Sequence, residues 1–159
     1  MLRRLIVIVG VVVLTGALAG PADATPPVQV RISAPATVVL EAPDWCPSAD
    51  VQFDVRQNYK MITFSGSTGF GFTSITAGPI FIVATNLDSG ASVTLPSSGP
   101  GFLDASGTPI IGTGPWLLFN PGSVLYLRGR MEFTPNEFGV EATVVHGTSR
   151  DVCAMVGAD

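Results

Sequence analysis

Residues 123–133, which read SVLYLRGRMEF, carry the clearest structural pattern of the chain. If alternate side chains point to opposite sides, as in a β-strand, one face holds Leu125, Leu127, Gly129, Met131 and Phe133. The other face then holds Val124, Tyr126, Arg128, Arg130 and Glu132. Such alternation is typical of a strand that packs one side on a core, so this segment predicts an antiparallel sheet.

Shorter runs of the same type precede and follow this segment. They cover residues 28–32, 37–41, 51–56, 59–65, 72–75, 80–85, 92–95, 109–111, 116–119, 138–146 and 151–156. Turn-forming residues separate many of them, for example in 86–90 (NLDSG) and 120–122 (NPG). The stretch 96–114 is rich in Gly, Pro and Ser, and we expect strand structure there only at 109–111. No window of helical length after residue 24 has 3.6-residue periodicity.

Many short strands at this spacing are typical of sandwiches and barrels. We therefore predict an all-β, single-domain antiparallel β-sandwich, with a partly open β-barrel as the alternative. The predicted domain runs over residues 25–159, with its core in 28–156.

The first 24 residues differ from the rest of the chain. Arg3 and Arg4 are followed by an apolar run over residues 5–18, and Ala22 and Ala24 form an A-x-A arrangement. This is the architecture of a secretory signal peptide, and the run is short for a membrane span, which takes about 20 residues. We expect cleavage after residue 24, an extracellular mature protein and no membrane span in it.

Charge and composition exclude several partners. Cleavage would remove Arg3, Arg4 and Asp23, which changes the formal net charge from −4 to about −5. The mature sequence has no Lys/Arg cluster, so it lacks the electrostatic footprint of a nucleic-acid-binding protein. Polybasic attraction to anionic membranes is equally unsupported.

Cys46 and Cys153 are the two cysteines of the chain. An even number of cysteines in a secreted protein predicts a disulfide. The bridge would close a loop of 107 residues (153 − 46), which chain-entropy models value at about 4.7 kcal/mol. The pair lacks C-x-x-C spacing, so a structural bridge is favoured over a redox site.

Few residues suit catalysis or metal binding. The chain has one histidine, His146, and no G-x-S-x-G motif, so no nucleophilic triad is selected even though Asp151 is near in sequence. Glu132 and Glu141 are a pair of acids for glycoside hydrolysis on paper, but both alternate with apolar residues and are expected on a solvated face. Calcium ligation by Asp44, Asp50 and Asp54 lacks the spacing of a calcium loop, and we predict no metal site and no cofactor.

Aromatic residues near glycines are the remaining candidates for binding. Phe70 and Phe72 lie within a glycine-rich segment, Trp116 follows Gly114-Pro115, and Trp45 precedes Cys46. Exposed rings at Phe70, Phe72 and Trp116 would form a ligand-facing surface for a sugar or a protein. The simpler alternative is that these rings, and Trp45 beside the bridge, pack in the core.

Several short motifs recur in one known family. They are Cys46 with VQFDV at 51–55, TNLDSG at 85–90, GP at 99–100, GR at 129–130 and DVCA at 151–154. In these the chain resembles a family of small, uncharacterised secreted actinobacterial proteins with an early Cys, a TNLDxG hairpin and a C-terminal DVCA motif. The resemblance covers most of residues 46–156 and implies one domain, secretion and the bridge, without implying an activity.

Two functions follow as hypotheses. The sequence favours a secreted non-catalytic protein that binds a cell-envelope component or another protein, or has a structural role at the cell surface. The alternative is a secreted carboxylate-based hydrolase acting on a polysaccharide. A cleft with two facing acids would indicate the hydrolase, whereas an apolar site with Phe70, Phe72 or Trp116 would indicate binding.

Overall fold

The computed structural model describes residues 25–65, 69, 71–137 and 139–159. The predicted signal peptide and Phe70 lie outside these residues. The described residues form strands and one short helix, in the order β1 (Val28–Ile32), β2 (Ala36–Leu40), β3 (Val51–Gln57), β4 (Tyr59–Thr63), β5 (Ser74–Ala77), β6 (Ile80–Asn86), β7 (Ser92–Pro96), β8 (Gly101–Leu103), β9 (Pro109–Asn120), β10 (Ser123–Asn136), β11 (Gly139–Asp151) and α1 (Val152–Met155). No helix in this part of the chain has the length and apolar character needed to cross a membrane.

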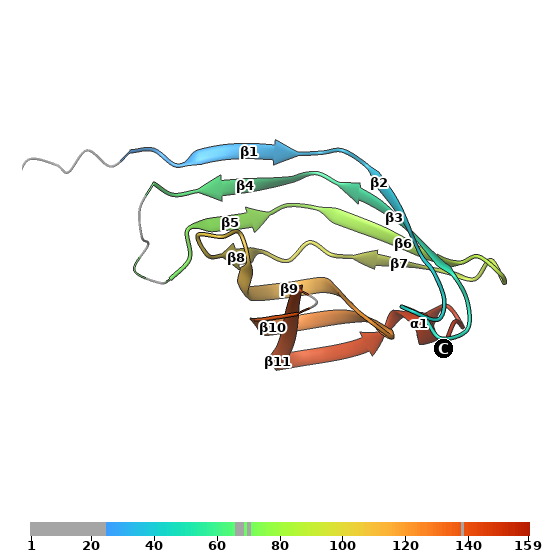
Figure 1. Ribbon diagram of the computed structural model, residues 1–159. Helices are drawn as coiled ribbons and strands as arrows, with labels where there is room; N and C mark the ends of the chain where they lie inside the picture. Colours follow the sequence, from blue (N-terminus) through green and yellow to red (C-terminus); the bar gives the residue numbers. More distant parts are fainter. Residues whose placement is uncertain (1–24, 66–68, 70, 138) are drawn as a thin grey trace, which may run out of the picture.

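The strands form two antiparallel sheets (Figure 1). A seven-stranded sheet has the order β1-β4-β5-β8-β9-β10-β11, and a four-stranded sheet has the order β2-β3-β6-β7. The sheets pack in a sandwich-like arrangement and are not closed into a barrel. The predicted all-β sandwich is therefore confirmed, and the barrel alternative is not.

Each strand of the small sheet continues a strand of the large one. The chain passes from one sheet to the other at short breaks, between β1 and β2, β3 and β4, β5 and β6, and β7 and β8. Asn58 and Pro79 occupy two of these breaks, and the Asn58 amide donates to the Pro79 carbonyl at 2.9 Å. At the next break, the Ser98 hydroxyl donates to the Ile80 carbonyl and accepts from the Ile80 amide. The breaks thus lie side by side.

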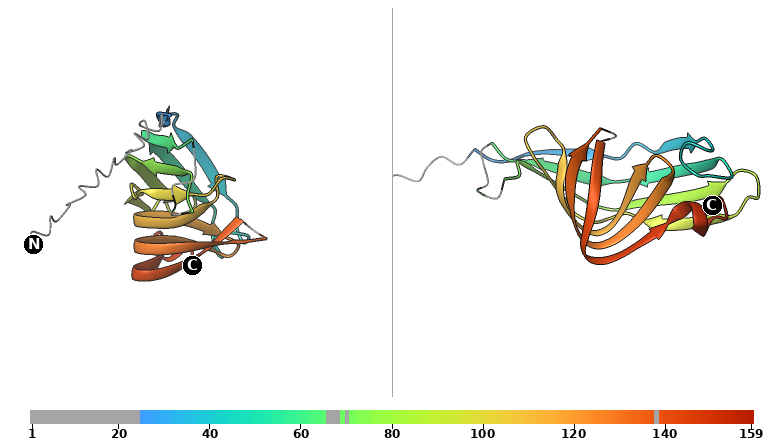
Figure 2. Two further views of the ribbon diagram at one scale, coloured as in Figure 1. Left: turned by 90° about the vertical axis from the view of Figure 1, so that its left-hand side faces the viewer. Right: turned by 60° about the horizontal axis from the view of Figure 1, so that its bottom comes forward.

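The same line continues through the last three strands as a row of glycines. Gly129 of β10 pairs with Gly114 of β9 on one side and with Gly147 of β11 on the other. A Cβ on Gly129 would collide with the carbonyl oxygen of His146, and Gly129 has a φ of +117°, a backbone conformation that favours glycine. We call the line from Asn58 through Gly78, Gly99, Gly114, Gly129 and Gly147 the crease. Along it the backbones approach closely and bend, and Figure 2 shows β9–β11 curving strongly.

Bending the sheet produces two hydrophobic cores. The first lies between the sheets, where Phe53 and Ile82 of the small sheet and Val124 and Tyr126 of β10 are buried with Val152 of α1. The second lies inside the curve of β9–β11 and contains Leu118, Leu127, Met131 and Phe133. The apolar face predicted for residues 123–133 is thus confirmed, but Val124 and Tyr126 on its other face are buried as well, because β10 passes between both cores.

Two segments differ from the sequence prediction. Residues 151–156 were expected as a strand, but α1 forms there because the Asp151 carboxylate accepts a hydrogen bond from the Cys153 amide at 2.8 Å and caps the helix. The stretch 96–114 was expected to be mostly irregular, but it contains β8 and the first half of β9. Gly101, Gly112 and Gly114 of this stretch are strand residues at close contacts, whereas Gly107 lies in the turn between β8 and β9.

A buried clasp holds the end of the molecule opposite β8. The predicted Cys46–Cys153 disulfide is present, with a Cα–Cα distance of 5.5 Å and both cysteines fully buried. Beside it, the Asn86 side chain donates to the carbonyls of Val156 and Gly157 at 3.2 and 3.0 Å. Its Oδ1 accepts from the amides of the following turn, at Asp88 and Ser89. We call the disulfide and Asn86 the C-terminal clasp, because they tie the end of the chain to the β2–β3 connection and the β6–β7 turn.

The crease makes a prediction about glycine replacement. Gly129→Ala should lower the free energy of unfolding by at least about 3 kcal/mol, because strain and a backbone collision add together. Gly122→Ala is the matched control, since Gly122 also has a positive φ of 78° but open space around its Cβ position; it should cost about 1 kcal/mol. Urea unfolding measures both, and equal losses would contradict the close approach at Gly129.

The clasp makes a second prediction. Asn86→Ala should lower the free energy of unfolding by about 2–4 kcal/mol, because buried carbonyls and amides lose their partners. Asp88→Ala, in the exposed part of the same turn, should change it by less than about 0.5 kcal/mol. Thermal or urea unfolding with the disulfide intact measures the difference; a loss below 1 kcal/mol for Asn86→Ala would show that the clasp relies on the disulfide alone.

Candidate functional site

The acids and the histidine considered for catalysis lie on exposed surface. Glu132 and Glu141 belong to adjacent strands, and the register places both on the same outer face of β10 and β11. Glu132 is 3.5 Å from Arg130 in an exposed ion pair, and His146 is exposed opposite Arg130. Both glutamates thus occupy one face of one sheet, not the two walls of a cleft as glycoside hydrolysis needs.

The acids near Cys46 stabilise local structure. Asp50 accepts a hydrogen bond from the Ala42 amide at 2.8 Å. Asp54 accepts from the Thr37 hydroxyl and the Gln52 amide group, and these bonds, the one from Thr37 first, lower the pKa of its carboxyl group. Among the described residues no cluster of three or more His, Cys, Asp or Glu residues is arranged to hold a metal ion.

The three candidate aromatic residues are distributed differently. Phe72 is half-buried and packs edge-to-face with Phe64 and Phe102, with ring centroids 6.3 and 5.0 Å apart. Trp116 lines a cavity instead. Phe70 lies outside the described residues. The structure thus places Trp116 at a candidate site and Phe72 in an aromatic cluster.

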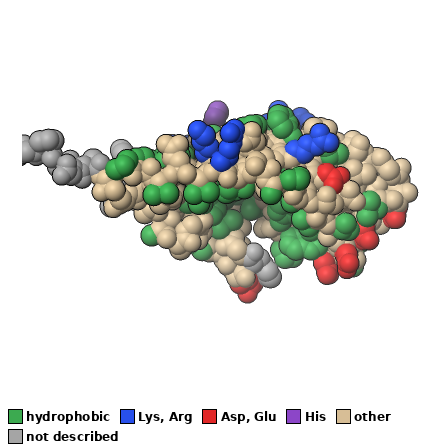
Figure 3. All heavy atoms as spheres, turned by 90° about the horizontal axis from the view of Figure 1, so that it is seen from above, with side chains coloured by type: hydrophobic (Ala, Val, Ile, Leu, Met, Phe, Trp, Pro, Cys, Tyr) green, Lys and Arg blue, Asp and Glu red, His purple; other side chains and the backbone are tan. Residues whose placement is uncertain are grey.

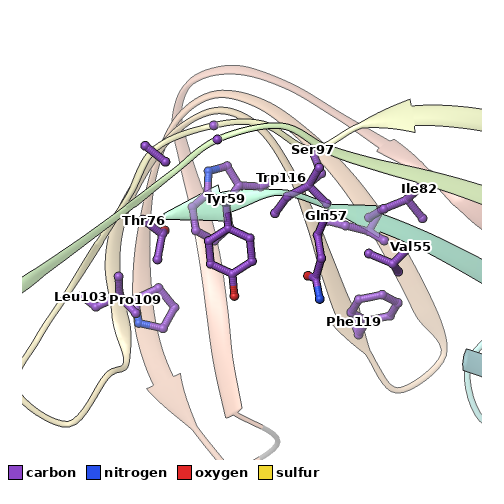
Figure 4. A pocket seen from close by; sticks show the side chains of 15 residues that line it. Val55, Gln57, Tyr59, Thr76, Ile82, Ser97, Leu103, Pro109, Trp116 and Phe119 are labelled. Atoms are coloured by element: carbon purple, nitrogen blue, oxygen red, sulfur yellow. The ribbon is translucent and has the colours of Figure 1, made fainter. Parts of the chain in front are cut away.

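The cavity lies between the sheets, on the inner side of the crease (Figure 4). Its volume is about 420 Å³, within the range of small-molecule sites. None of its lining residues is charged: Val55, Gln57, Tyr59, Thr76, Ala77, Gly78, Ile80, Ile82, Ser97, Gly99, Leu103, Pro109, Trp116, Leu117 and Phe119. The space-filling view shows a hollow with hydrophobic side chains around it, whereas acidic side chains gather at one end of the molecule (Figure 3). An uncharged, mostly apolar lining suits an uncharged, mostly apolar ligand.

Few of the lining side chains are polar: Gln57 and Tyr59 on the β3–β4 segment, Thr76 on β5 and Ser97 directly after β7. The side chains of Gln57 and Tyr59 project from the sheet into the open part of the cavity in Figure 4. The Gln57 amide group donates to the Ala34 carbonyl at 2.8 Å, which fixes the orientation of the side chain and leaves its oxygen as an acceptor. The Tyr59 hydroxyl can both donate and accept. Gln57 and Tyr59 are thus two polar groups that can orient a ligand in the open part of the cavity.

Trp116 occupies a space that glycines leave open. A Cβ on Gly101 would lie 2.5 Å from Cη2 of the indole, and one on Gly112 would lie 2.9 Å from Nε1. On the other side, the Phe133 ring centroid is 5.2 Å from that of Trp116. The indole Nε1 is buried without a hydrogen-bond partner, which costs about 1–3 kcal/mol. The close packing around the ring therefore holds Trp116 in one position, although its indole N–H makes no hydrogen bond there.

A second cavity adjoins the first. Its volume is about 290 Å³, and it lies toward the inside of the β9–β11 curve, where Leu118, Phe133 and Val140 line it. Pro109, Trp116, Leu117 and Phe119 line both cavities. The two apolar spaces thus share four lining residues, all of them in β9.

A rigid turn forms one wall of the site. Leu103 and Pro109, which both line the main cavity, flank the turn at residues 104–108. The Asp104 carboxylate accepts from the Ser106 hydroxyl at 2.6 Å and from the amides of Ser106 and Thr108. These hydrogen bonds, that from the Ser106 hydroxyl first, lower the pKa of Asp104. The turn holds the two wall residues in a defined position.

Most of the site was not foreseen from the sequence. Trp116 was a candidate, but Val55, Tyr59 and Phe119 were assigned only to strands. Tyr59 lies directly beside Asn58 at the crease, whereas Val55 and Phe119 lie between the crease and the first core, where the Phe119 ring packs on Phe53. The sequence contains the strand breaks that form the crease. Only the strand register shows that these breaks lie side by side.

Comparison with protein-family models, with curated proteins and with solved structures finds no match for this chain. The candidate site therefore depends on its own geometry. That geometry is an uncharged cavity, two orienting polar groups and an indole fixed by glycines.

The fixed indole makes a testable prediction. In a Trp45→Phe background, where Trp116 is the remaining tryptophan, Gly101→Ala should shift the emission maximum and weaken the near-UV circular dichroism, because the new methyl displaces the ring. Gly107→Ala is the control, since its Cβ position in the same turn region is open, and it should leave both spectra unchanged. Identical spectra for the Gly101→Ala protein and its parent would contradict the described packing.

Proposed function

We propose that the protein is a secreted, non-catalytic binding protein that holds a small apolar molecule in the cavity between its sheets. The observation that carries the proposal is the cavity of about 420 Å³ with no charged residue in its lining. Secretion is supported by the signal-peptide pattern of residues 1–24. The buried Cys46–Cys153 bridge suits an oxidising compartment.

The geometry favours binding over hydrolysis. The cavity offers no carboxylate and no histidine among its lining residues, and Glu132 and Glu141 face solvent on another part of the sheet. A general acid needs to lie within hydrogen-bond reach of its substrate. The hydrolase alternative therefore gains no support from the cavity, whereas a cell-envelope component with an apolar part would fit it.

A neutral fluorescent probe tests the proposal. N-phenyl-1-naphthylamine should bind the native protein saturably with increased fluorescence, because the cavity removes its rings from water. Val55→Phe fills the cavity and should weaken binding at least about tenfold. Val39→Phe is the matched control, because Val39 pairs with Gln52 on the opposite, exposed face of the same sheet, and it should leave the affinity unchanged.

Two results would contradict the proposal. One is the absence of saturable probe binding to natively folded protein. The other is equal affinity in the Val55→Phe and Val39→Phe proteins, which would place the probe outside the cavity. Circular dichroism of each variant establishes that the fold is retained.

A further inference from the structure

We infer that the natural ligand is a neutral lipid with a single unbranched chain and a hydroxyl or ester group, which lies along β9 with its polar group at Tyr59 and Gln57. This inference deepens the proposed function and depends on it. It rests on three features of the site: the absence of charge, the placement of the polar groups and the shape of the two adjoining spaces.

The lining excludes a charged ligand group in the cavity. A carboxylate or ammonium taken from water into an apolar site without a partner is strongly disfavoured. Among the residues that the structure describes, neither the main cavity nor the second cavity has an acidic or a basic lining residue. A fatty acid anion would therefore bury its charge without compensation, whereas a fatty alcohol or a monoacylglycerol would not.

The polar groups of Gln57 and Tyr59 face the same open part of the cavity. The Gln57 oxygen accepts and the Tyr59 hydroxyl donates or accepts, and both project into the open part of the cavity (Figure 4). An alcohol can donate to the Gln57 oxygen and accept from the Tyr59 hydroxyl. The remaining surface, formed by Val55, Ile82 and Phe119 among others, offers mainly hydrophobic contact.

The shape favours a chain over a compact ring system. Four residues, Pro109, Trp116, Leu117 and Phe119, line both cavities, so the two spaces follow the same strand. A chain that extends from the main cavity along these shared residues reaches the second cavity at Val140 and gains about 0.8 kcal/mol for each further CH₂ group that it buries. A rigid ring system uses only the first space.

The test compares probes of matched size by Trp116 fluorescence in the Trp45→Phe protein. At pH 8, well above the usual pKa of a carboxyl group, 1-decanol should bind at least about tenfold more tightly than decanoate and more tightly than 1-hexanol. Tyr59→Phe should weaken 1-decanol binding about three- to tenfold, the effect of one neutral hydrogen bond. Thr94→Val, which removes a hydroxyl from the exposed face of β7, should leave the 1-decanol affinity unchanged.

Other outcomes overturn the inference. Decanoate binding as tightly as 1-decanol would show that the site accepts charge, and 1-naphthol binding more tightly than 1-decanol would indicate a compact aromatic ligand. No response to 1-decanol also overturns it. In each case saturable N-phenyl-1-naphthylamine binding that is lost in Val55→Phe would leave the proposed function standing, so the two failures are distinguishable.

Discussion

The close approach of backbones along the crease is the constraint on which the rest of the structure depends. An antiparallel sheet with full side chains at these positions could not bend so sharply, because a Cβ on Gly129 or Gly147 would collide with the neighbouring strand. The bend turns one continuous set of long strands into two packed layers. It also creates the cavity, since Tyr59, Gly78, Gly99 and Trp116 all lie at or beside the crease. Fold and candidate site thus have a common physical origin.

The C-terminal clasp and the candidate site occupy different parts of the molecule. The C-terminal clasp, with its buried disulfide and Asn86, joins the chain end to the β2–β3 and β6–β7 connections. The first core lies next to it, where the Phe53 and Phe119 rings meet at 5.5 Å across the sheets. The cavity begins beyond these rings, toward the crease. The first core thus lies between the clasp and the candidate cavity.

How far the sequence predicts this structure depends on the type of signal. Alternation in residues 51–56 and 123–133 identified strands correctly, because period-two patterns report directly on which side is buried. The disulfide followed from cysteine number and the predicted compartment. By contrast, Gly112 and Gly114 were interpreted as loop residues although they pair within β9, because glycine in a turn and glycine at a close backbone contact look alike in sequence. Residues 151–156 were predicted as a strand because they are mostly apolar. The helix cap depends on one residue, Asp151, which is a weaker signal than the apolar run. Of the site, Trp116 alone was a candidate, since the other lining residues come together only through the bend.

The central claim is that the bend of the sheet forms the binding site. Intermolecular nuclear Overhauser effects, measured with methyl-labelled protein and bound N-phenyl-1-naphthylamine, test it most directly. The account predicts contacts from the probe to the methyl groups of Val55 and Ile82 and to the Trp116 ring. Contacts to the exposed methyl groups of Val28 and Val39 instead would contradict it.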